Sequence, residues 1–205
     1  IMNKPNMFKT WVKDLEKLPR IKDYPTPEEL NTKIWLADSV KKALQGIDFL
    51  SKQEMVYWDL ETSGFNYFKK RIGVFAASWE EGSSFVMGEP IIHHPKVKKA
   101  LVEFLSSEGW ISGGHNLKFD NKFTNHFWKD LNCNARVDED TLLMHYVLDE
   151  ERGHGLKDLS GYYLNVPDYD KELKRYINED NPDANYLDVP QDILFKYAGH
   201  DTDYG

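Results

Sequence analysis

The segment Met55–Thr62 (MVYWDLET) joins a predicted core strand to a pair of acids. Its apolar and aromatic residues are typical of a buried strand, which we predict over Met55–Leu60. Side chains two residues apart share one face of a strand, so Asp59 and Glu61 point the same way. Adjacent carboxylates repel each other, and a divalent cation between them removes that cost. Taken alone, the pair also fits an acidic strand end exposed to solvent.

Strands and helices alternate on both sides of this segment. Further strands are predicted at Lys33–Ala37, Ile72–Trp79, Ser84–Met87, within Gly109–His115 and around Ala135–Val137. Helices are predicted at Val40–Leu50 after the cap Ser39, from Pro95, over Lys118–Asp130, over Glu139–Glu150 and from Pro190. The first strands have the pattern of an antiparallel meander, and the later ones alternate with helices. This order predicts an α/β fold, a mixed sheet flanked by helices.

Length and composition bound the class of protein. The chain has 205 residues, which suits one domain with an extension. We predict an N-terminal extension over residues 1–30, with a helix between Met7 and Leu18, and a main domain over residues 31–205. The single cysteine, Cys133, fits a reducing compartment, and no apolar run is long enough to span a membrane. We therefore expect a soluble, intracellular protein.

The charge balance is acidic. The chain carries 26 Lys and Arg against 34 Asp and Glu, a formal net charge of −8. Phosphate neutralisation needs cations, so this balance excludes a protein that grips nucleic acid by bulk positive charge. It leaves open a nuclease in which carboxylates hold metal ions that meet the phosphate.

Two further segments carry acids that could act with the pair on the strand. In Gly113–Asp120 (GGHNLKFD), glycines permit a tight turn, and Asp120 falls in the first turn of the next helix. In Phe195–Asp201 (FKYAGHD), Tyr197 and Asp201 are four residues apart and share one helix face. Alone, each has a structural explanation, a helix-stabilising carboxylate in the first case and a tyrosine–aspartate hydrogen bond in the second.

Together the three segments resemble a known family. Asp-x-Glu on a strand, Asn-x-x-x-Asp at a strand–helix junction and Tyr-x-x-x-Asp on a late helix are similar to the motifs of DEDD 3′–5′ exonucleases. More narrowly, the chain resembles the tyrosine subclass, the proofreading domain of family A DNA polymerases of the bacterial DNA polymerase I type. Asp140–Leu143 (DTLL) and Gly155–Leu159 (GLKDL) add to the resemblance, which covers residues 31–205. It implies a ribonuclease H-like fold.

The resemblance also implies a catalytic centre with two divalent metal ions, Mg²⁺ or Mn²⁺. Asp59, Glu61 and Asp201 would bind one ion. Asp59 would touch the second ion as well, and Asp120 would reach it through water. Tyr197, and not a histidine, would orient the attacking water. Oxygen ligands alone suit these hard ions and argue against zinc.

The implied substrate is the 3′ end of single-stranded DNA. Phe65 lies where the family often places an apolar wedge against the terminal base, and the expected substrate-binding residues are Phe65, Asn116, Thr62 and Leu60. Asn116 could instead cap the helix that follows it. The loop Phe65–Arg71 interleaves aromatic and basic residues, as single-strand binding surfaces do, but it also fits an ordinary connection between two strands.

Two other functions stay open at this point. The same fold could act on RNA, as in ribonuclease D-like enzymes, or serve as a non-catalytic scaffold domain of a polymerase. Scaffold members of the family usually lack the metal carboxylates, whereas this chain has Asp59, Glu61, Asp120 and Asp201. Asp201 also lies close to Gly205, and terminal helical turns fray. We therefore expect the natural chain to continue into a polymerase domain, which would be its partner together with DNA.

Overall fold

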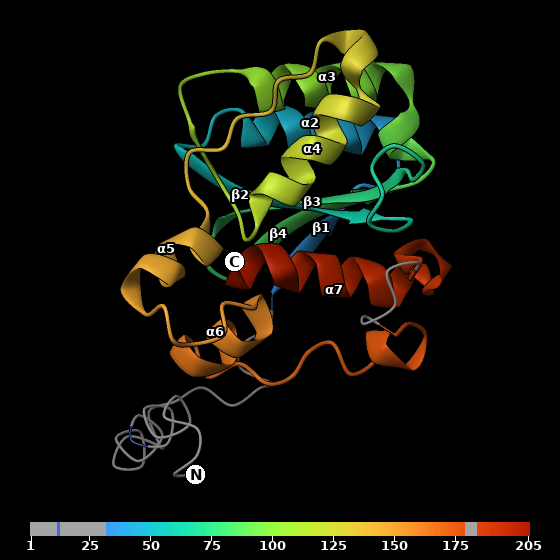
Figure 1. Ribbon diagram of the computed structural model, residues 1–205. Helices are drawn as coiled ribbons and strands as arrows, with labels where there is room; N and C mark the ends of the chain where they lie inside the picture. Colours follow the sequence, from blue (N-terminus) through green and yellow to red (C-terminus); the bar gives the residue numbers. More distant parts are fainter. Residues whose placement is uncertain (1–11, 13–31, 179–183) are drawn as a thin grey trace.

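The computed structural model describes residues 32–178 and 184–205, together with Val12 (Figure 1). Apart from Val12, the predicted extension over residues 1–30 lies outside the described residues, and its helix and linker with it. Within these described residues, five strands form one mixed sheet in the order β1-β4-β3-β2-β5. Their bounds are β1 Lys33–Leu36, β2 Met55–Thr62, β3 Ile72–Glu80, β4 Ser83–Gly88 and β5 Ile111–Gly113.

The middle of the sheet is the predicted meander. Strands β2, β3 and β4 run antiparallel in sequence, with Asp59 opposite Ala76. The two outer strands are parallel to their neighbours, β1 to β4 and β5 to β2. β1 precedes the meander in sequence but joins it at the far edge, which the sequence pattern did not indicate. The observed architecture is the ribonuclease H-like mixed sheet that the resemblance implied.

Helices cover both faces of the sheet. The α-helices are α2 Val40–Leu50, α3 Pro95–Ser106, α4 Leu117–Phe127, α5 Thr141–Leu148, α6 Leu156–Tyr163 and α7 Gln191–Tyr204. Single 3₁₀ turns occur at η2 Ile91–His93, η3 Lys129–Leu131, η4 Leu173–Arg175 and η5 Tyr186–Asp188. Figure 1 shows α2, α3 and α4 on one side of the sheet and α7 crossing the other side, with α5 and α6 beside the C-terminal half of α7.

The side chains of β2 alternate between these two sides. Val56, Trp58 and Leu60 point into the larger apolar core, together with residues of α2, α3 and α4. The other face of the sheet packs against α7 in a smaller apolar cluster. Asp59 and Glu61 belong to this second face because they alternate with the core residues of the same strand.

Close backbone packing brings the strands and helices near the acids together. A Cβ at Gly114 would lie 2.7 Å from the Trp58 carbonyl oxygen, so only glycine lets the chain after β5 pass this close to β2. A Cβ at Gly199 would lie 2.9 Å from Ile34 Cδ1, so a larger residue there would require the Ile34 side chain to shift. Gly114 therefore keeps the chain after β5 in contact with the strand that carries Asp59, and Gly199 lets α7 lie close to β1 and β4.

Most predicted elements are confirmed to within a few residues. Ser39 caps α2, because its side chain accepts a hydrogen bond from the Lys42 backbone nitrogen at 3.3 Å. The predicted helix Lys118–Asp130 is divided into α4 and the turn η3. The final helix begins at Gln191, one residue after the predicted Pro190.

The predicted strand around Ala135–Val137 is wrong. The segment runs beside β5, but it bonds to Ser112 through a mixture of backbone and side-chain groups, and the Ser112 carbonyl accepts from both the Asp138 and the Glu139 backbone nitrogens. The Ser112 backbone nitrogen donates to Asp138 Oδ2 at 2.9 Å, and the Ser112 hydroxyl donates to the Arg136 carbonyl at 2.7 Å. A regular pairing cannot form where these groups already have partners.

Candidate active site

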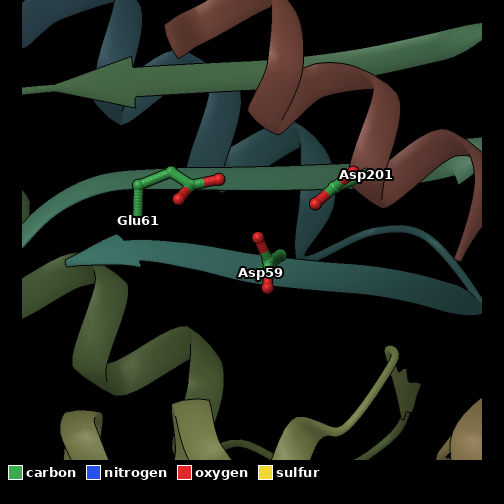
Figure 2. A group of neighbouring side chains, drawn as sticks. All are labelled: Asp59, Glu61 and Asp201. Carbon is green, nitrogen blue, oxygen red and sulfur yellow. The ribbon is translucent and has the colours of Figure 1, made fainter. Parts of the chain in front are cut away.

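Three carboxylates from two distant segments converge between the sheet and α7. Asp59 and Glu61 come from β2, and Asp201 comes from the last turns of α7 (Figure 2). One oxygen of each residue lies within 4.8 Å of those of the other two. The expected common face of Asp59 and Glu61 is thus confirmed, and α7 crosses the sheet so that Asp201 faces both. This spacing lets a single cation contact all three.

Burial makes these carboxylates costly to ionise together. Glu61 and Asp201 are buried, and Asp59 is half-buried. Burial, followed by the charge of Asp201, raises the pKa of Asp59 to about 7. Burial and the charge of Asp59 hold the pKa of Glu61 well above its ordinary value. Such a cluster favours a bound cation, because opposite charge stabilises the ionised form.

Asp120 lies next to this group without being one of the three converging ligands. It is 2% exposed in the first turn of α4, and burial followed by the charge of Asp59 raises its pKa well above the ordinary value. Asp120 Oδ1 and Glu61 Oε1 are buried and have no hydrogen-bond partner among the described residues. Unpartnered carboxylate oxygens are expected at a site built for a cation, since they otherwise lose their hydration without compensation.

The donor set fits a hard divalent ion. Every candidate ligand in the group is a carboxylate oxygen, the ligand type that Mg²⁺ and Mn²⁺ prefer. The orphaned oxygens of Glu61 and Asp120 fit the same interpretation. The acidic cluster is therefore a candidate divalent-metal site.

Tyr197 and Asp201 share a face of α7, as predicted, and both contact Lys157. The Lys157 ammonium donates to the Tyr197 hydroxyl at 2.6 Å and to Asp201 Oδ1 and Oδ2 at 2.9 Å and 2.8 Å. The Tyr169 hydroxyl donates to Asp201 Oδ1 at 2.6 Å. Burial, followed by the charge of Asp201, holds the pKa of Tyr197 well above its ordinary value. Tyr197 is therefore a neutral phenol at neutral pH.

Sequence reasoning missed two of these residues. Lys157 lies in the segment Gly155–Leu159, which supported the family resemblance, but no role was assigned to it. A lysine within a segment typical of the family was a usable signal. Tyr169 stands in a stretch with no recognisable motif, so only the folded chain places it against Asp201.

Two adjoining cavities meet at the carboxylates. One, of about 300 Å³, is lined on one side by Gly155, Leu156 and Lys157. The other, of about 140 Å³, includes Phe65, Phe119 and Asp120 in its wall. Both are lined by Asp59, His115, Asn116 and Asp201. The acids therefore lie at the junction of an open cleft that a chain end could enter.

The predicted substrate-binding residues lie in different positions around this cleft. Phe65 is 44% exposed and packs edge to face against Phe119, with 6.1 Å between the ring centroids. Asn116 is at the N-cap position of α4 in a left-handed conformation (φ 56°), and its side chain makes no capping hydrogen bond. The capping alternative for Asn116 is therefore wrong, and the side chain is left to line both cavities.

The other two candidates are more enclosed. Thr62 is buried and its hydroxyl donates to the Gly64 carbonyl at 3.0 Å. The Leu60 side chain is 5% exposed and packs in the larger core, although the residue also contributes to the wall of the smaller cavity. Contact of any of the four residues with a substrate stays a prediction.

The loop after β2 carries exposed aromatic and basic side chains beside the cleft. The rings of Tyr67 and Phe68 pack against each other, with 4.3 Å between their centroids, and both rings contact the His126 ring edge to face. Arg71 is engaged in an ion pair with Glu89 at 2.7 Å. Phe68 nevertheless remains 67% exposed, so the loop presents an aromatic surface to solvent.

The sheet has the ribonuclease H-like order, and three carboxylates converge on one of its faces as a candidate metal site. Residues 36–205 match the family model of the DNA polymerase A exonuclease domain, described as 3′–5′ exonuclease. The chain therefore belongs to this family of 3′–5′ exonuclease domains.

A curated relative agrees with this assignment, and solved structures agree with the fold. The DNA polymerase of Escherichia phage T5 is 40% identical over 118 residues, which cover 50% of this chain and 13% of the phage protein. The fold matches Brucella melitensis NrnC with bound Mg²⁺ (TM-score 0.55, 19% identity, 85% of this chain and 75% of that one). It also matches Trypanosoma brucei RNase D in complex with RNA (TM-score 0.63, 13% identity, 85% of this chain and 61% of that one).

A polymerase structure is also similar in fold. The POL domain of Pol1 from M. smegmatis, in complex with DNA, aligns with a TM-score of 0.54 and 16% identity over 83% of this chain and 26% of that one. Among the described residues, no helix has the length and apolar character to cross a bilayer.

Proposed function

We propose that this domain is a metal-dependent 3′–5′ exonuclease that removes nucleotides from the 3′ end of single-stranded DNA. The observation that carries the proposal is the convergence of Asp59, Glu61 and Asp201, with oxygens within 4.8 Å of one another at the junction of an open cleft. The preference for DNA and a proofreading role are supported by the 40% identity to a phage DNA polymerase.

Asp59, Glu61 and Asp201 would hold one divalent ion, and Asp59 with Asp120 would hold a second. When bound, Mg²⁺ or Mn²⁺ at such a pair of sites supplies stabilisation of the attacking and leaving oxygens in an in-line displacement. The rigid positions of the carboxylates on β2 and α7 preorganise this charge distribution before the substrate arrives. In this proposal the acids act by holding the metal ions in place, and they transfer no proton themselves.

Tyr197 would orient the water that attacks the terminal phosphodiester. Its oxygen accepts a hydrogen bond from Lys157, so its own phenolic proton is free to point elsewhere. Tyr197 and Asp59 line the same cavity, which puts the hydroxyl beside the carboxylates. A neutral tyrosine with a raised pKa acts here as an orienting group, since it does not take a proton from water.

The substrate would enter through the cleft beside the exposed loop. Phe65 would stack on the terminal base, and the Asn116 side chain would contact the terminal nucleotide, with Thr62 and Leu60 at the cavity wall. A net charge of −8 disfavours binding of duplex DNA through bulk positive charge. We therefore propose that residues 31–205 act as the exonuclease domain of a longer polymerase chain, preceded by an extension over residues 1–30.

RNA is the second candidate substrate. The observation in its favour is the fold similarity to Trypanosoma brucei RNase D in complex with RNA, at a TM-score of 0.63. That likeness carries 13% identity, against 40% for the phage DNA polymerase, so DNA is the better supported substrate. A contact to the ribose 2′-hydroxyl would distinguish the two.

A paired nuclease assay tests the proposal. Single-stranded DNA and RNA of the same sequence, labelled at the 5′ end, are incubated with the protein and either Mg²⁺ or EDTA. We expect a ladder of products shortened from the 3′ end of DNA in the presence of Mg²⁺, and no such ladder in EDTA. Faster shortening of RNA would favour the second candidate, and equal release in EDTA would overturn the metal-dependent mechanism.

A further inference from the structure

Lys157 brings a cation into the carboxylate cluster. Its ammonium lies 2.8 Å and 2.9 Å from the two oxygens of Asp201 and 2.6 Å from the Tyr197 hydroxyl. The same group lies 4.4 Å from the centre of the Tyr197 ring and 5.4 Å from that of Tyr169. A positive charge is thus held on Asp201, the residue of α7 that completes the candidate metal site.

These contacts leave Asp201 little capacity for another cation. A carboxylate offers about four lone-pair sites. Three hydrogen bonds already reach Asp201, two from Lys157 and one from Tyr169. Glu61 and Asp120, by contrast, each keep a buried oxygen without a partner among the described residues. The lysine therefore satisfies the α7 side of the cluster and leaves the β2 and α4 sides unsatisfied.

The position of Lys157 in its own helix carries an electrostatic cost. It is the second residue of α6, where the partial positive charge of the helix N-terminus disfavours a cation. Burial also acts to lower its pKa, but the charges of Asp201, Glu61 and Asp59 outweigh burial, and the pKa is raised. The ammonium is stable in this place because it donates hydrogen bonds to both oxygens of Asp201 and lies near the charges of Glu61 and Asp59.

We propose that Lys157 is the built-in counter-ion of the metal-free site, and that a divalent ion must displace its ammonium from Asp201 in order to bind. This inference rests on the proposed metal site. It assigns Lys157 two effects of opposite sign. The lysine stabilises the metal-free domain, and the same contact weakens the binding of the first metal ion, since the two cations compete for one carboxylate.

Metal binding and thermal melting separate these two effects without any nuclease assay. The test variant is Lys157→Met, which keeps the length of the side chain and removes the charge. Mn²⁺ binding is measured by calorimetry, and the melting temperature is measured in EDTA and in saturating Mn²⁺. The matched control is Lys118→Met, an equal change of charge at an exposed position in the first turn of α4, two residues from Asp120.

The expected result for Lys157→Met is a Kd for Mn²⁺ lowered by about fivefold or more, with a melting temperature in EDTA below that of the wild type. Saturating Mn²⁺ should close most of this gap in melting temperature. Lys118→Met should change the Kd far less. Conversely, Lys157→Arg, which keeps a cation, should stay closer to the wild type in both measurements.

The outcomes distinguish this inference from the proposed function. If Mn²⁺ binds the wild type and Asp59→Asn removes the binding, but Lys157→Met leaves the Kd unchanged or raises it, the counter-ion role is wrong. An equal gain in affinity for Lys118→Met would also overturn it, since bulk charge would then explain the effect. If the wild type binds no Mn²⁺ and Asp59→Asn changes nothing, the metal site itself fails.

Discussion

The two faces of the sheet differ in the side chains that strand β2 contributes to them: apolar residues on one face and carboxylates on the other. On one face, Val56, Trp58 and Leu60 of β2 pack against α2, α3 and α4 in an apolar core. On the other face, Asp59 and Glu61 of the same strand meet Asp201 beneath α7. The difference is produced by side-chain alternation alone, because successive residues of a strand point to opposite faces.

The faces differ in what they contribute to the free energy of folding. Burial of apolar side chains on the first face stabilises the domain. Burial of several carboxylates on the second face costs stability until a cation compensates the charge. The raised pKa values of Asp59, Glu61 and Asp120 record this cost. The apolar face thus offsets the cost of the functional face, and substitutions on the two faces should have opposite consequences.

The largest expected effect is that of Asp59→Ala. This change removes a ligand proposed to touch both metal ions, so nucleotide release should fall by at least about 10²–10³-fold. The melting temperature in EDTA should stay the same or rise, because one of the mutually repelling carboxylates is gone. Activity is measured as nucleotide release with Mg²⁺, and stability by thermal melting. A purified variant with near wild-type activity would contradict the assignment of the metal site.

Leu101→Ala should show the reverse pattern on the apolar face. Leu101 in α3 is fully buried in the larger core. Its truncation should lower the free energy of unfolding by about 2–5 kcal/mol. Urea denaturation measures the loss, and nucleotide release per folded molecule at low temperature should be unchanged. A loss of activity in a fully folded sample would show that the two faces are not independent.

Tyr197→Phe should have a smaller effect, confined to the chemistry. Loss of the orienting hydroxyl should slow nucleotide release by up to about 10²-fold, at the low end for a positioned acid–base group. The Kd for Mn²⁺ should stay close to that of the wild type, since the carboxylates are intact. Single-turnover rates at saturating Mg²⁺ test this expectation. An unchanged rate would make Tyr197 a structural residue of the cleft.

The last effect concerns pH and changes stability alone. The pKa of Asp59 is raised to about 7 in the folded, metal-free domain, with burial as the first cause. A raised carboxyl pKa stabilises the fold below the unfolded value near 4, and this contribution is lost as the pH rises through about 7. Asp59→Asn removes that dependence. Its melting temperature in EDTA should therefore exceed that of the wild type at about pH 8, with the difference closing at about pH 4. A difference that stays constant would contradict the raised pKa.

Much of the fold was predictable from local sequence patterns. The limits of β2, β3, α2 and α3 follow from apolar periodicity and from caps such as Ser39. The failed strand around Ala135–Val137 has a tertiary cause, since the Asp138 side chain accepts from the Ser112 nitrogen and the Ser112 carbonyl accepts from two successive backbone nitrogens, which is not the pattern of a regular pairing. The parallel position of β1 beside β4 was equally invisible, because strand order depends on contacts between distant segments.

The site divides in the same way. Periodicity correctly placed Asp59 with Glu61 on one strand face and Tyr197 with Asp201 on one helix face. Whether Asn116 caps α4 could not be decided locally, because its left-handed backbone depends on the turn that brings Gly114 against Trp58. The contacts of Lys157 and Tyr169 with Asp201 span 44 and 32 residues, and no local pattern encodes them.

The sequence by itself determined which side chains share a strand or a helix face, because backbone geometry repeats every 2 or about 3.6 residues whatever surrounds it. That repeat predicted the pair Asp59 and Glu61 and the pair Tyr197 and Asp201, and the order of the motifs that contain them carried the resemblance to 3′–5′ exonucleases. Only the tertiary structure decided that these faces meet in one cleft with Lys157 between them. That meeting depends on how α6 and α7 pack against the sheet, a sum of many contacts between residues far apart in the chain.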